Sequence, residues 1–343
     1  MGLRDIELIA EIGQAHEGSL GMAHAYIDAL RDTGVDVIKW QVHIAEAESS
    51  PEEPFRVRLS SQDASRMDYW RRMEFTLPQW KELKQHCEEA GMEFLASPFS
   101  VKAVEWLEEL GVRRYKIGSG EVTNFLLLER IARTSKPVIL SSGMSSWEEL
   151  DEAVRFLRSR IKQLAVLQCT TAYPTEPEEY GLNLIAALKE RYPDVRVGFS
   201  DHSGDIYAPL AAAVLGAEIL EFHVVFDKRM FGPDVQASIT IDRVRDLVRG
   251  VRILQRALRN PVDKVLTPSL QAVKGIFEKS LAVSRDMRVG ERIRLEDLEA
   301  KKPAGMGIPA RAFERVLGRR LRRAKRAYEF LRDDDLEKPE DPS

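Results

Sequence analysis

The sequence predicts a closed (β/α)8 TIM barrel followed by a small β-rich domain, and three observations support this fold class. Over residues 1–260, eight short apolar runs alternate with amphipathic segments of helical length, which is typical of parallel βαβ units. Eight such units indicate a closed barrel rather than an open sheet. The 343 residues also exceed one ordinary domain of about 150 residues, and the pattern changes after a Pro-containing stretch near residues 260–270.

The strand and helix candidates follow one another in a regular order. Several of the predicted helices end in glycine, which suits the left-handed conformation of a helix C-terminal cap. The helix-like segments include 23–34, 77–91, 101–111, 146–160 and 207–217. The predicted strands are 6–13, 36–42, 93–99, 114–120, 137–143, 164–174, 195–202 and 219–226.

One interval, between the second and third predicted strands, is more than double the usual length. It contains an insertion at residues 43–73. An insertion that follows the carboxyl end of a barrel strand lies on the catalytic face. We therefore expect either a lid that contacts substrate or a peripheral decoration, and the sequence does not favour one over the other.

The C-terminal part of the chain forms a separate module. Residues 280–308 are strand-like and rich in turns, and residues 322–336 repeat their apolar spacing followed by Asp-Leu. This module is too short for a second large core, so we expect it to lean on another surface. The predicted organisation is a barrel at 1–260, a linker at 261–276 and a small domain at 277–343.

Composition excludes several classes of protein. Hydrophobic residues make up 44% and charged residues 31% of the chain, and the net charge is −4, so a core can form without the basic field of a nucleic-acid binder. No apolar run reaches the roughly 18 residues of a membrane span, and the N-terminus does not read as a signal peptide. The two cysteines form no CxxC pair. We expect a soluble cytoplasmic enzyme with no nucleic-acid or membrane partner.

Polar side chains end all eight predicted strands, where a barrel gathers its active site. Lys39 and Lys116, with several hydroxyls, indicate a pocket for phosphate or a phosphate-plus-carboxylate ligand. The lysines could instead be structural partners of Glu11 or Glu121, and Lys116 could form a Schiff base. No nucleotide-binding glycine motif follows a strand. The strand-end residues are Glu11, Lys39, Gln41, Ser97, Lys116, Ser119, Glu121, Ser141, Ser142, Thr170, Thr171, Tyr173, Ser200, Asp201, His202, Glu221 and His223.

Two histidines indicate a metal site. His202 and His223 end neighbouring strands, so their imidazoles can share a divalent ion whose shell is completed by water or by Glu11. The site lacks thiolates, which favours Mn²⁺ or Mg²⁺ over structural zinc. His16 could reach the site from the first loop, and Cys169 is expected to be an inert packing residue. Helix or loop surfaces are expected for His24, His43 and His86.

Nine short motifs occur in a fixed order along the barrel part of the chain. They are AEIGQAHEG, KWQ, SPFS, KIGSGE, LSSGM, QCTTAYP, GFSDHS, EFH and GPDVQAS. Their order and spacing resemble those of the sialic acid synthase family, which comprises N-acetylneuraminate synthase and its relatives. Residues 280–308 resemble the antifreeze-like (SAF) domain that follows the barrel in that family, so the resemblance covers essentially the whole chain.

The resemblance implies a reaction and a set of roles. Family members condense phosphoenolpyruvate with an N-acetylmannosamine-type sugar and release phosphate by C–O cleavage, giving a nine-carbon 2-keto acid. A divalent Mn²⁺ or Mg²⁺ held by His202 and His223 would polarise the aldehyde. Catalytic roles would fall to Glu121, Lys116 and Glu11. Phosphoenolpyruvate would contact Lys39, Ser97, Lys116, Ser119, Ser141 and Ser200. The sugar would contact Gln41, Glu121, Thr171, Tyr173, Asp234 and Lys302.

The family also implies a domain-swapped homodimer, in which the small domain brings Lys302 to the partner's barrel. The chain departs from the family pattern at four places, which we expect near the acceptor or the metal: Ala15-His16, Thr171, Phe222 and Lys302. The acceptor sugar therefore stays open, and legionaminic, pseudaminic or other surface-polysaccharide precursors are alternatives. Two further functions are a Schiff-base pyruvate aldolase that uses Lys116 and a catalytically inactive sugar-binding barrel.

Overall fold

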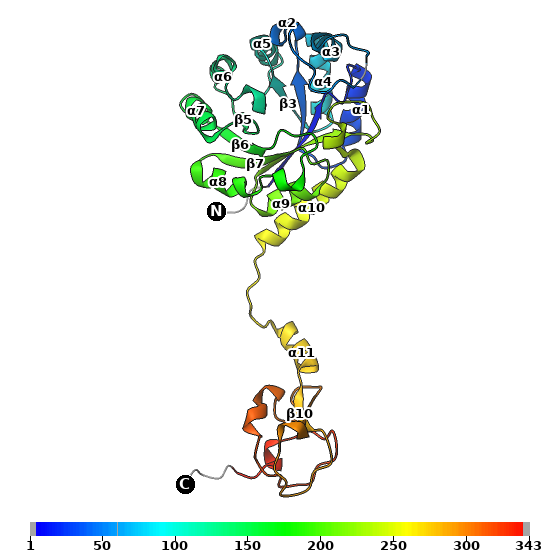
Figure 1. The fold of residues 1–343 in the computed structure, drawn as a ribbon, viewed down its shortest axis with the longest axis vertical. Helices are drawn as coiled ribbons and strands as arrows, with labels where there is room; N and C mark the ends of the chain where they lie inside the picture. Colours follow the sequence, from blue (N-terminus) through cyan, green and yellow to red (C-terminus); the bar gives the residue numbers. More distant parts are fainter. Residues whose placement is uncertain (1–4, 60, 339–343) are drawn as a thin grey trace. The chain divides into compact units, whose positions relative to one another are not determined.

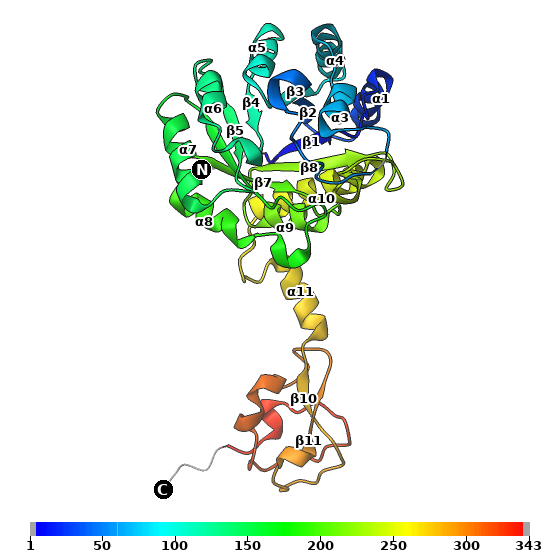
Figure 2. The same ribbon diagram turned by 45° about the horizontal axis from the view of Figure 1, so that its top comes forward.

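The predicted barrel is confirmed. The computed structural model describes residues 5–59 and 61–338. Eight parallel strands pair in chain order, and β1 pairs with β8 to close the sheet (Figures 1 and 2). A short strand, β9 (Ile239–Thr240), adds to β8. The barrel strands are β1 (Glu7–Gly13), β2 (Val37–Val42), β3 (Glu93–Pro98), β4 (Tyr115–Ile117), β5 (Val138–Ser141), β6 (Leu164–Cys169), β7 (Arg196–Asp201) and β8 (Ile219–Val225).

Helices follow the strands and cover the outside of the sheet (Figure 2). Helix α7 shows why these segments are helical. Ser146 and Glu149 form a capping box at its start, and its buried residues recur at the spacing of one helix face. The barrel helices are α1 (Leu20–Leu30), α4 (Leu77–Glu89), α5 (Val101–Glu109), α6 (Phe125–Ala132), α7 (Trp147–Arg158), α8 (Asn183–Arg191), α9 (Tyr207–Val214) and α10 (Ile241–Arg259).

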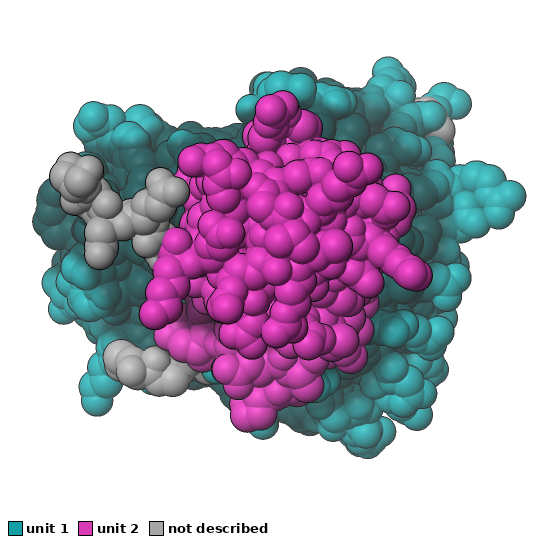
Figure 3. Space-filling model, turned by 90° about the horizontal axis from the view of Figure 1, so that it is seen from below, with its two compact units in different colours: residues 1–261 teal, residues 262–343 magenta. Residues whose placement is uncertain are grey.

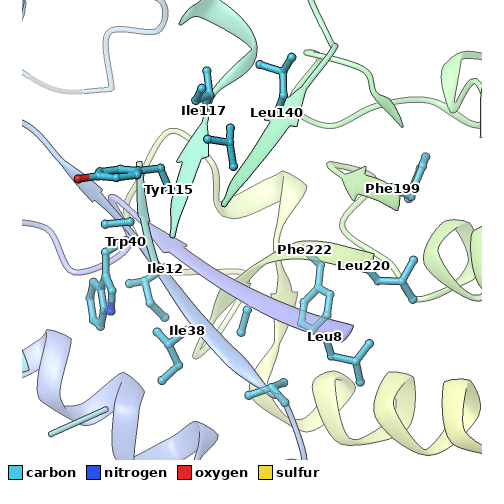
Figure 4. Packing of buried hydrophobic residues seen from close by; sticks show 14 of the residues in the cluster. Leu8, Ile12, Ile38, Trp40, Tyr115, Ile117, Leu140, Phe199, Leu220 and Phe222 are labelled. Carbon is cyan, nitrogen blue, oxygen red and sulfur yellow. The ribbon is translucent and has the colours of Figure 1, made fainter. Parts of the chain in front are cut away.

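Alternation along each strand divides the buried residues into two sets. Leu8 and Ile12 of β1 point towards the helices and join the large cluster in Figure 4, whereas Ile9 joins a small cluster of strand residues. The same alternation puts Phe222 of β8 in the large cluster, between Glu221 and His223, which face the cavity. The expectation that Phe222 lies near the acceptor or metal was therefore wrong.

The insertion after β2 is folded. It contains α2 (Ala45–Glu48) and α3 (Arg66–Met73). Ser65 caps α3, and its hydroxyl accepts a hydrogen bond from the Asp68 backbone N–H at 3.2 Å. Apolar side chains of these two helices form a buried cluster of their own, packed against Phe55. This cluster gives the insertion a defined shape on the face where β2 ends.

The chain divides into two compact units, Met1–Pro261 and Val262–Ser343, coloured separately in Figure 3. The first unit ends at Pro261, one residue beyond the end that the sequence predicts for the barrel. The predicted linker contains α11 (Pro268–Phe277), which is mostly exposed. In the second unit β10 (Ser280–Val283) pairs antiparallel with β11 (Leu298–Lys301), and the unit has its own buried apolar cluster.

The sequence echo in the small domain corresponds to repeated structure. The Asp297 carboxylate accepts from the Arg294 backbone N–H at 3.0 Å, and Asp335 accepts from Arg332 N–H at 2.9 Å. Both aspartates are buried.

Over residues 5–59 and 61–338, no helix combines the length and apolar composition required to cross a lipid bilayer.

Candidate active site

The strand ends open into one cavity of about 420 Å³. Residues from the barrel strands, the loops that follow them and the insertion line it. Glu11 lies directly behind the wall, where its carboxylate accepts a hydrogen bond from Gln41 at 2.7 Å. Lys302 belongs to the second unit, where its ammonium lies over the Phe277 ring. The predicted site residues that line the cavity are Lys39, Gln41, Ser97, Lys116, Ser119, Glu121, Ser141, Thr171, Tyr173, Ser200, His202, His223 and Asp234.

Two lysines and two glutamates form a buried charge cluster at the base of the cavity. Lys39 Nζ lies 3.1 Å from a carboxylate oxygen of Glu11 and 3.1 Å from one of Glu221. Lys116 Nζ lies 3.1 Å from the same Glu221 oxygen and donates to Ser141 Oγ at 2.7 Å. Lys39 is thus paired with Glu11, as the alternative of a structural lysine pair requires. The carboxylate that both lysines share, however, belongs to Glu221 and not to Glu121.

The two lysines differ in how firmly they hold their protons. Burial lowers the pKa of Lys39, but the carboxylates of Glu11 and Glu221 outweigh burial and raise it. Burial also lowers the pKa of Lys116, and there Glu221 does not compensate, so the net shift is downward. An anion placed beside Lys116 would therefore favour its charged form.

Hydroxyl groups and a close backbone contact line the same cavity as the two lysines. Within the described residues, Ser97 Oγ and Thr171 Oγ1 are buried without a hydrogen-bond partner, which leaves them available to a ligand. Ser119 Oγ accepts from the Gly143 N–H at 3.0 Å. A Cβ at Gly143 would lie 2.8 Å from Ser119 Oγ and 2.9 Å from Cys169 Sγ, so this close approach requires glycine.

His202 and His223 lie side by side, with ring centroids 5.1 Å apart. His202 Nδ1 lies 2.9 Å from the Thr170 carbonyl oxygen; because that oxygen only accepts, Nδ1 carries the proton and Nε2 is the nitrogen that could bind an ion. Burial lowers the pKa of His223 to about 3, so its imidazole is neutral, as a metal ligand must be. The described residues contain no group of three or more side chains that could hold a metal. The pair therefore fits an ion whose other ligands are water or substrate oxygens.

The same cavity contains the residues expected to contact the sugar. Asp234 pairs with Arg56 of the insertion, and the Arg56 guanidinium lies 4.2 Å above the Tyr173 ring. Glu121 accepts from Asn124 Nδ2 at 2.7 Å. Burial raises the pKa of Glu121 despite this hydrogen bond. The shift favours the protonated form, in which a carboxylic acid can donate to a sugar oxygen or move a proton.

The insertion supplies cavity residues that sequence reasoning did not name: Glu48, Glu53, Arg56, Arg66 and Trp70. The insertion therefore forms part of the cavity wall, and its contact with substrate stays a prediction. Gln14 also lines the cavity; it lies within the AEIGQAHEG motif, but sequence reasoning did not name it as a site residue. The aromatic and arginine residues of 43–73 were the available signal, since such side chains are common in binding surfaces.

The structure corrects four other expectations. His43 is buried in the cavity wall between the Trp70 and Phe99 rings, not on a surface. His16 does not line the cavity; its ring packs on Phe75 at 4.6 Å. Ala15 also lies outside the lining. Cys169, expected only to pack, lines the cavity, with its sulfur 3.8 Å from His202 Nδ1.

Comparisons with known proteins agree with this architecture. The NeuB family model matches residues 26–263, and the SAF domain model matches residues 278–337. The chain is 33% identical over 332 residues to the N,N′-diacetyllegionaminic acid synthase of Campylobacter jejuni, covering 95% of this chain and 98% of that protein. It is 33% identical over 316 residues to human N-acetylneuraminate-9-phosphate synthase, covering 92% of this chain and 88% of that protein.

A solved structure is also similar. The N-acetylneuraminic acid synthetase of Leptospira borgpetersenii, in complex with citrate, superposes with a TM-score of 0.69 at 29% identity. The match covers 79% of this chain and 90% of that one. Both domain models and these relatives lead to one assignment: the chain belongs to the NeuB family and carries a C-terminal SAF domain.

Proposed function

We propose that the chain is a phosphoenolpyruvate-dependent nonulosonic acid synthase. The observation that carries this proposal is the buried pair Lys39 and Lys116, set among free hydroxyls beside two histidines. C3 of phosphoenolpyruvate forms a bond to the aldehyde carbon of an N-acetylmannosamine-type sugar. Water adds at C2, and the resulting intermediate loses phosphate as its C2–O bond breaks. The products are a nine-carbon 2-keto acid and inorganic phosphate.

The lysines and hydroxyls hold phosphoenolpyruvate and oppose its negative charge throughout the reaction. Lys39 remains protonated because two carboxylates raise its pKa, while phosphate binding favours the charged form of Lys116. Ser97, with its unpartnered hydroxyl, supplies a neutral donor. These fixed charges need no rearrangement when phosphate leaves, so positioning and electrostatics supply much of the rate enhancement.

The two histidines fit a divalent ion, and we assign His202 and His223 as its protein ligands, with Mn²⁺ or Mg²⁺ as the candidates. When bound, such an ion supplies Lewis-acid activation of an aldehyde oxygen. The protein orients the His202 ring through the Thr170 carbonyl and packs the tilted Tyr173 ring against it, with the ring centroids 4.4 Å apart. Glu11 is engaged with Lys39 and Gln41, so its role is to hold these residues in place.

The charges around the acceptor end favour an uncharged sugar over a phosphorylated one. Four carboxylates line that part of the cavity, against two guanidinium groups. Both arginines are already engaged: Arg56 with Asp234 and Arg66 with Glu53. A phosphate ester there would face net negative charge. We therefore place N-acetylmannosamine first, with N-acetylneuraminate as product, and the unphosphorylated legionaminic and pseudaminic precursors as alternatives.

We also propose that the SAF domain completes the barrel of a second chain in a domain-swapped homodimer and that Lys302 contacts the acceptor there. The proposal rests on the family membership and on the SAF domain that follows the barrel in the same chain. Both cysteines, Cys87 and Cys169, are unpaired in the structure, which supports a reducing, cytoplasmic location.

Phosphoenolpyruvate labelled with ¹⁸O in its bridging C–O–P oxygen tests the reaction class. C–O cleavage transfers the label to the released phosphate, and we expect nearly all of it there. Retention of label in the keto acid would refute the mechanism. The Schiff-base alternative predicts instead that borohydride with pyruvate traps a covalent adduct on Lys116; we expect no adduct.

A further inference from the structure

His43 is a buried imidazole in the cavity wall, and the reaction proposed above gives it no role. It follows β2 directly, and its side chain is 5% exposed. Its ring lies between the Trp70 and Phe99 rings, with centroids 4.0 Å and 4.5 Å away and interplanar angles of 22° and 14°. These two stacked rings fix the plane of the imidazole and leave its edge, with the two nitrogens, for polar contacts.

The insertion holds one edge of this ring. His43 Nδ1 lies 2.6 Å from Oε1 of Glu48, the last residue of α2. The second oxygen of Glu48 accepts from the Ile44 backbone N–H at 3.2 Å, and this side chain is also buried. Because a carboxylate only accepts hydrogen bonds, Nδ1 carries a proton. Glu48 therefore sets the direction in which the other ring nitrogen points.

That other nitrogen reaches two side-chain amides. His43 Nε2 lies 3.0 Å from Gln41 Oε1 and 3.0 Å from Gln14 Nε2. Gln14 Nε2 also donates to Gln41 Oε1, so the three side chains form a closed triangle. Nε2 can either donate to the Gln41 oxygen or accept from the Gln14 amide. In the first case His43 holds Gln41 directly, and in the second it holds Gln41 through Gln14.

The nitrogen of the Gln41 amide is held by the charge cluster at the base of the cavity. Gln41 Nε2 donates to Glu11 Oε1 at 2.7 Å, and the other Glu11 oxygen pairs with Lys39. An amide nitrogen has two N–H groups, and among the described residues Glu11 alone accepts from this one. Since the Gln41 oxygen is already engaged, the group that Gln41 can offer to a ligand is an N–H donor.

We propose that His43 is a positioning residue for the acceptor sugar: held by Glu48, it fixes the Gln41 amide so that the free N–H meets an oxygen of the sugar. The inference rests on the function proposed above, in which Gln41 contacts the acceptor. Without the imidazole, Gln41 keeps Glu11 and Gln14, but Gln14 has lost its own bond to the ring. The direction of the free N–H is then no longer set, and the sugar loses a preorganised donor.

The variant His43→Phe separates the polar role of the ring from its packing. Phenylalanine can stay stacked between Trp70 and Phe99, but it has no nitrogen for Glu48 or for the amides. In the phosphate-release assay with Mn²⁺ and the full-length chain, we expect the KM for the sugar to rise about fivefold or more, as for one lost hydrogen bond. The KM for phosphoenolpyruvate should not change, because Lys39 keeps both of its carboxylates.

The sugar in this assay is N-acetylmannosamine, or 2,4-diacetamido-2,4,6-trideoxymannose where only that one supports release. The control His86→Phe replaces a histidine of α4 outside the cavity lining and should keep both wild-type KM values. Circular dichroism verifies that each variant is folded. If His43→Phe does not fold because Glu48 is left unpaired, His43→Phe/Glu48→Gln removes that carboxylate and should show the same rise in the sugar KM.

Glu48 also lines the cavity, so a double-mutant cycle tests whether it acts through His43. Glu48→Gln should raise the sugar KM in the wild-type background and add little in the His43→Phe background. Equal effects in both backgrounds would mean that Glu48 acts on the sugar independently of the ring, and would overturn the proposed link.

A folded His43→Phe protein with the wild-type KM for the sugar would overturn the proposal, because packing alone would then account for the buried ring. An equal rise in the KM for phosphoenolpyruvate would also overturn it, since the effect would not be confined to the acceptor. The wild-type assay separates this failure from that of the proposed function. If the wild type releases no phosphate with any of the sugars, the proposed function is wrong and the role of His43 falls with it.

Discussion

Arg56 of the insertion pairs with Asp234 of the loop after β8, and the same guanidinium lies 4.2 Å above the Tyr173 ring. One side chain thus connects the insertion to two residues assigned to the acceptor sugar. Asp234 is only 14% exposed. Arg56 therefore holds Asp234 and Tyr173 in place and keeps the insertion over the acceptor end of the cavity.

Replacing Arg56 should affect the acceptor and not phosphoenolpyruvate. In Arg56→Ala we expect the KM for the sugar to rise about two- to fivefold, as for the loss of a partly exposed ion pair. The KM for phosphoenolpyruvate should not change, since Lys39 and Lys116 are untouched. Arg58→Ala is the matched control, because Arg58 is exposed and packs over Phe55. Equal effects of the two variants on the sugar KM would argue against this role.

Removing the carboxylate shared by the lysines should destabilise the fold. Glu221→Gln leaves Lys116 buried without its carboxylate and removes one of the two that pair with Lys39. We expect the free energy of unfolding in urea to fall by about 3–5 kcal/mol, and added phosphate to restore part of it by replacing the lost charge. Glu218→Gln, in a partly exposed pair with Arg196, should change stability by less than about 1 kcal/mol. If Glu221→Gln were as stable as the wild type, the loss of this carboxylate would leave no uncompensated charge on the two lysines, which would contradict this prediction.

Acid should destabilise the folded chain partly through His16. Burial lowers the pKa of His16 to about 3, and the nearby His43 and Arg72 add to this shift. Between pH 6.5 and 3 the unfolded chain binds the extra proton, so stability is present above pH 6.5 and is lost as the pH falls through this window. The loss is at most about 1.4 kcal/mol per pH unit. The free energy of unfolding in urea should therefore change less with pH in His16→Phe than in the wild type, by up to this amount. An identical dependence of that free energy on pH in both proteins would contradict the assignment.

Mixing two inactive variants tests the domain swap. Lys116→Met disables the barrel site and Lys302→Ala disables the small domain. In a swapped dimer, the barrel of the Lys302→Ala chain receives an intact Lys302 from the Lys116→Met chain, so mixed dimers regain one site in two. We expect activity to reappear after the two variants are unfolded and refolded together. If the mixture has only the summed activity of its parts, Lys302 acts within its own chain or not at all.

Residues whose position is fixed by strand alternation were predictable from the sequence. Lys39, Lys116 and His223 lie on the inward side of their strands. Because successive side chains of a strand alternate between the two faces of the sheet, all three face the same cavity. Phe222 shows the limit of reasoning from motifs. It stands between Glu221 and His223, which face the cavity, and strand alternation therefore turns its side chain towards the helices. Arg56 and His43 were not predictable, because their positions depend on how the insertion folds on itself and no period constrains that.

Phosphate release from phosphoenolpyruvate tests the central claim most directly. The assay contains Mn²⁺ and one of four sugars: N-acetylmannosamine, its 6-phosphate, 2,4-diacetamido-2,4,6-trideoxymannose or the corresponding altrose, each with and without EDTA. The account predicts release with one unphosphorylated sugar, abolished by EDTA and absent with the 6-phosphate. Release with the 6-phosphate would contradict the inference drawn from the acidic acceptor end. Release unaffected by EDTA, or pyruvate consumption with an adduct trapped on Lys116, would contradict the account as a whole.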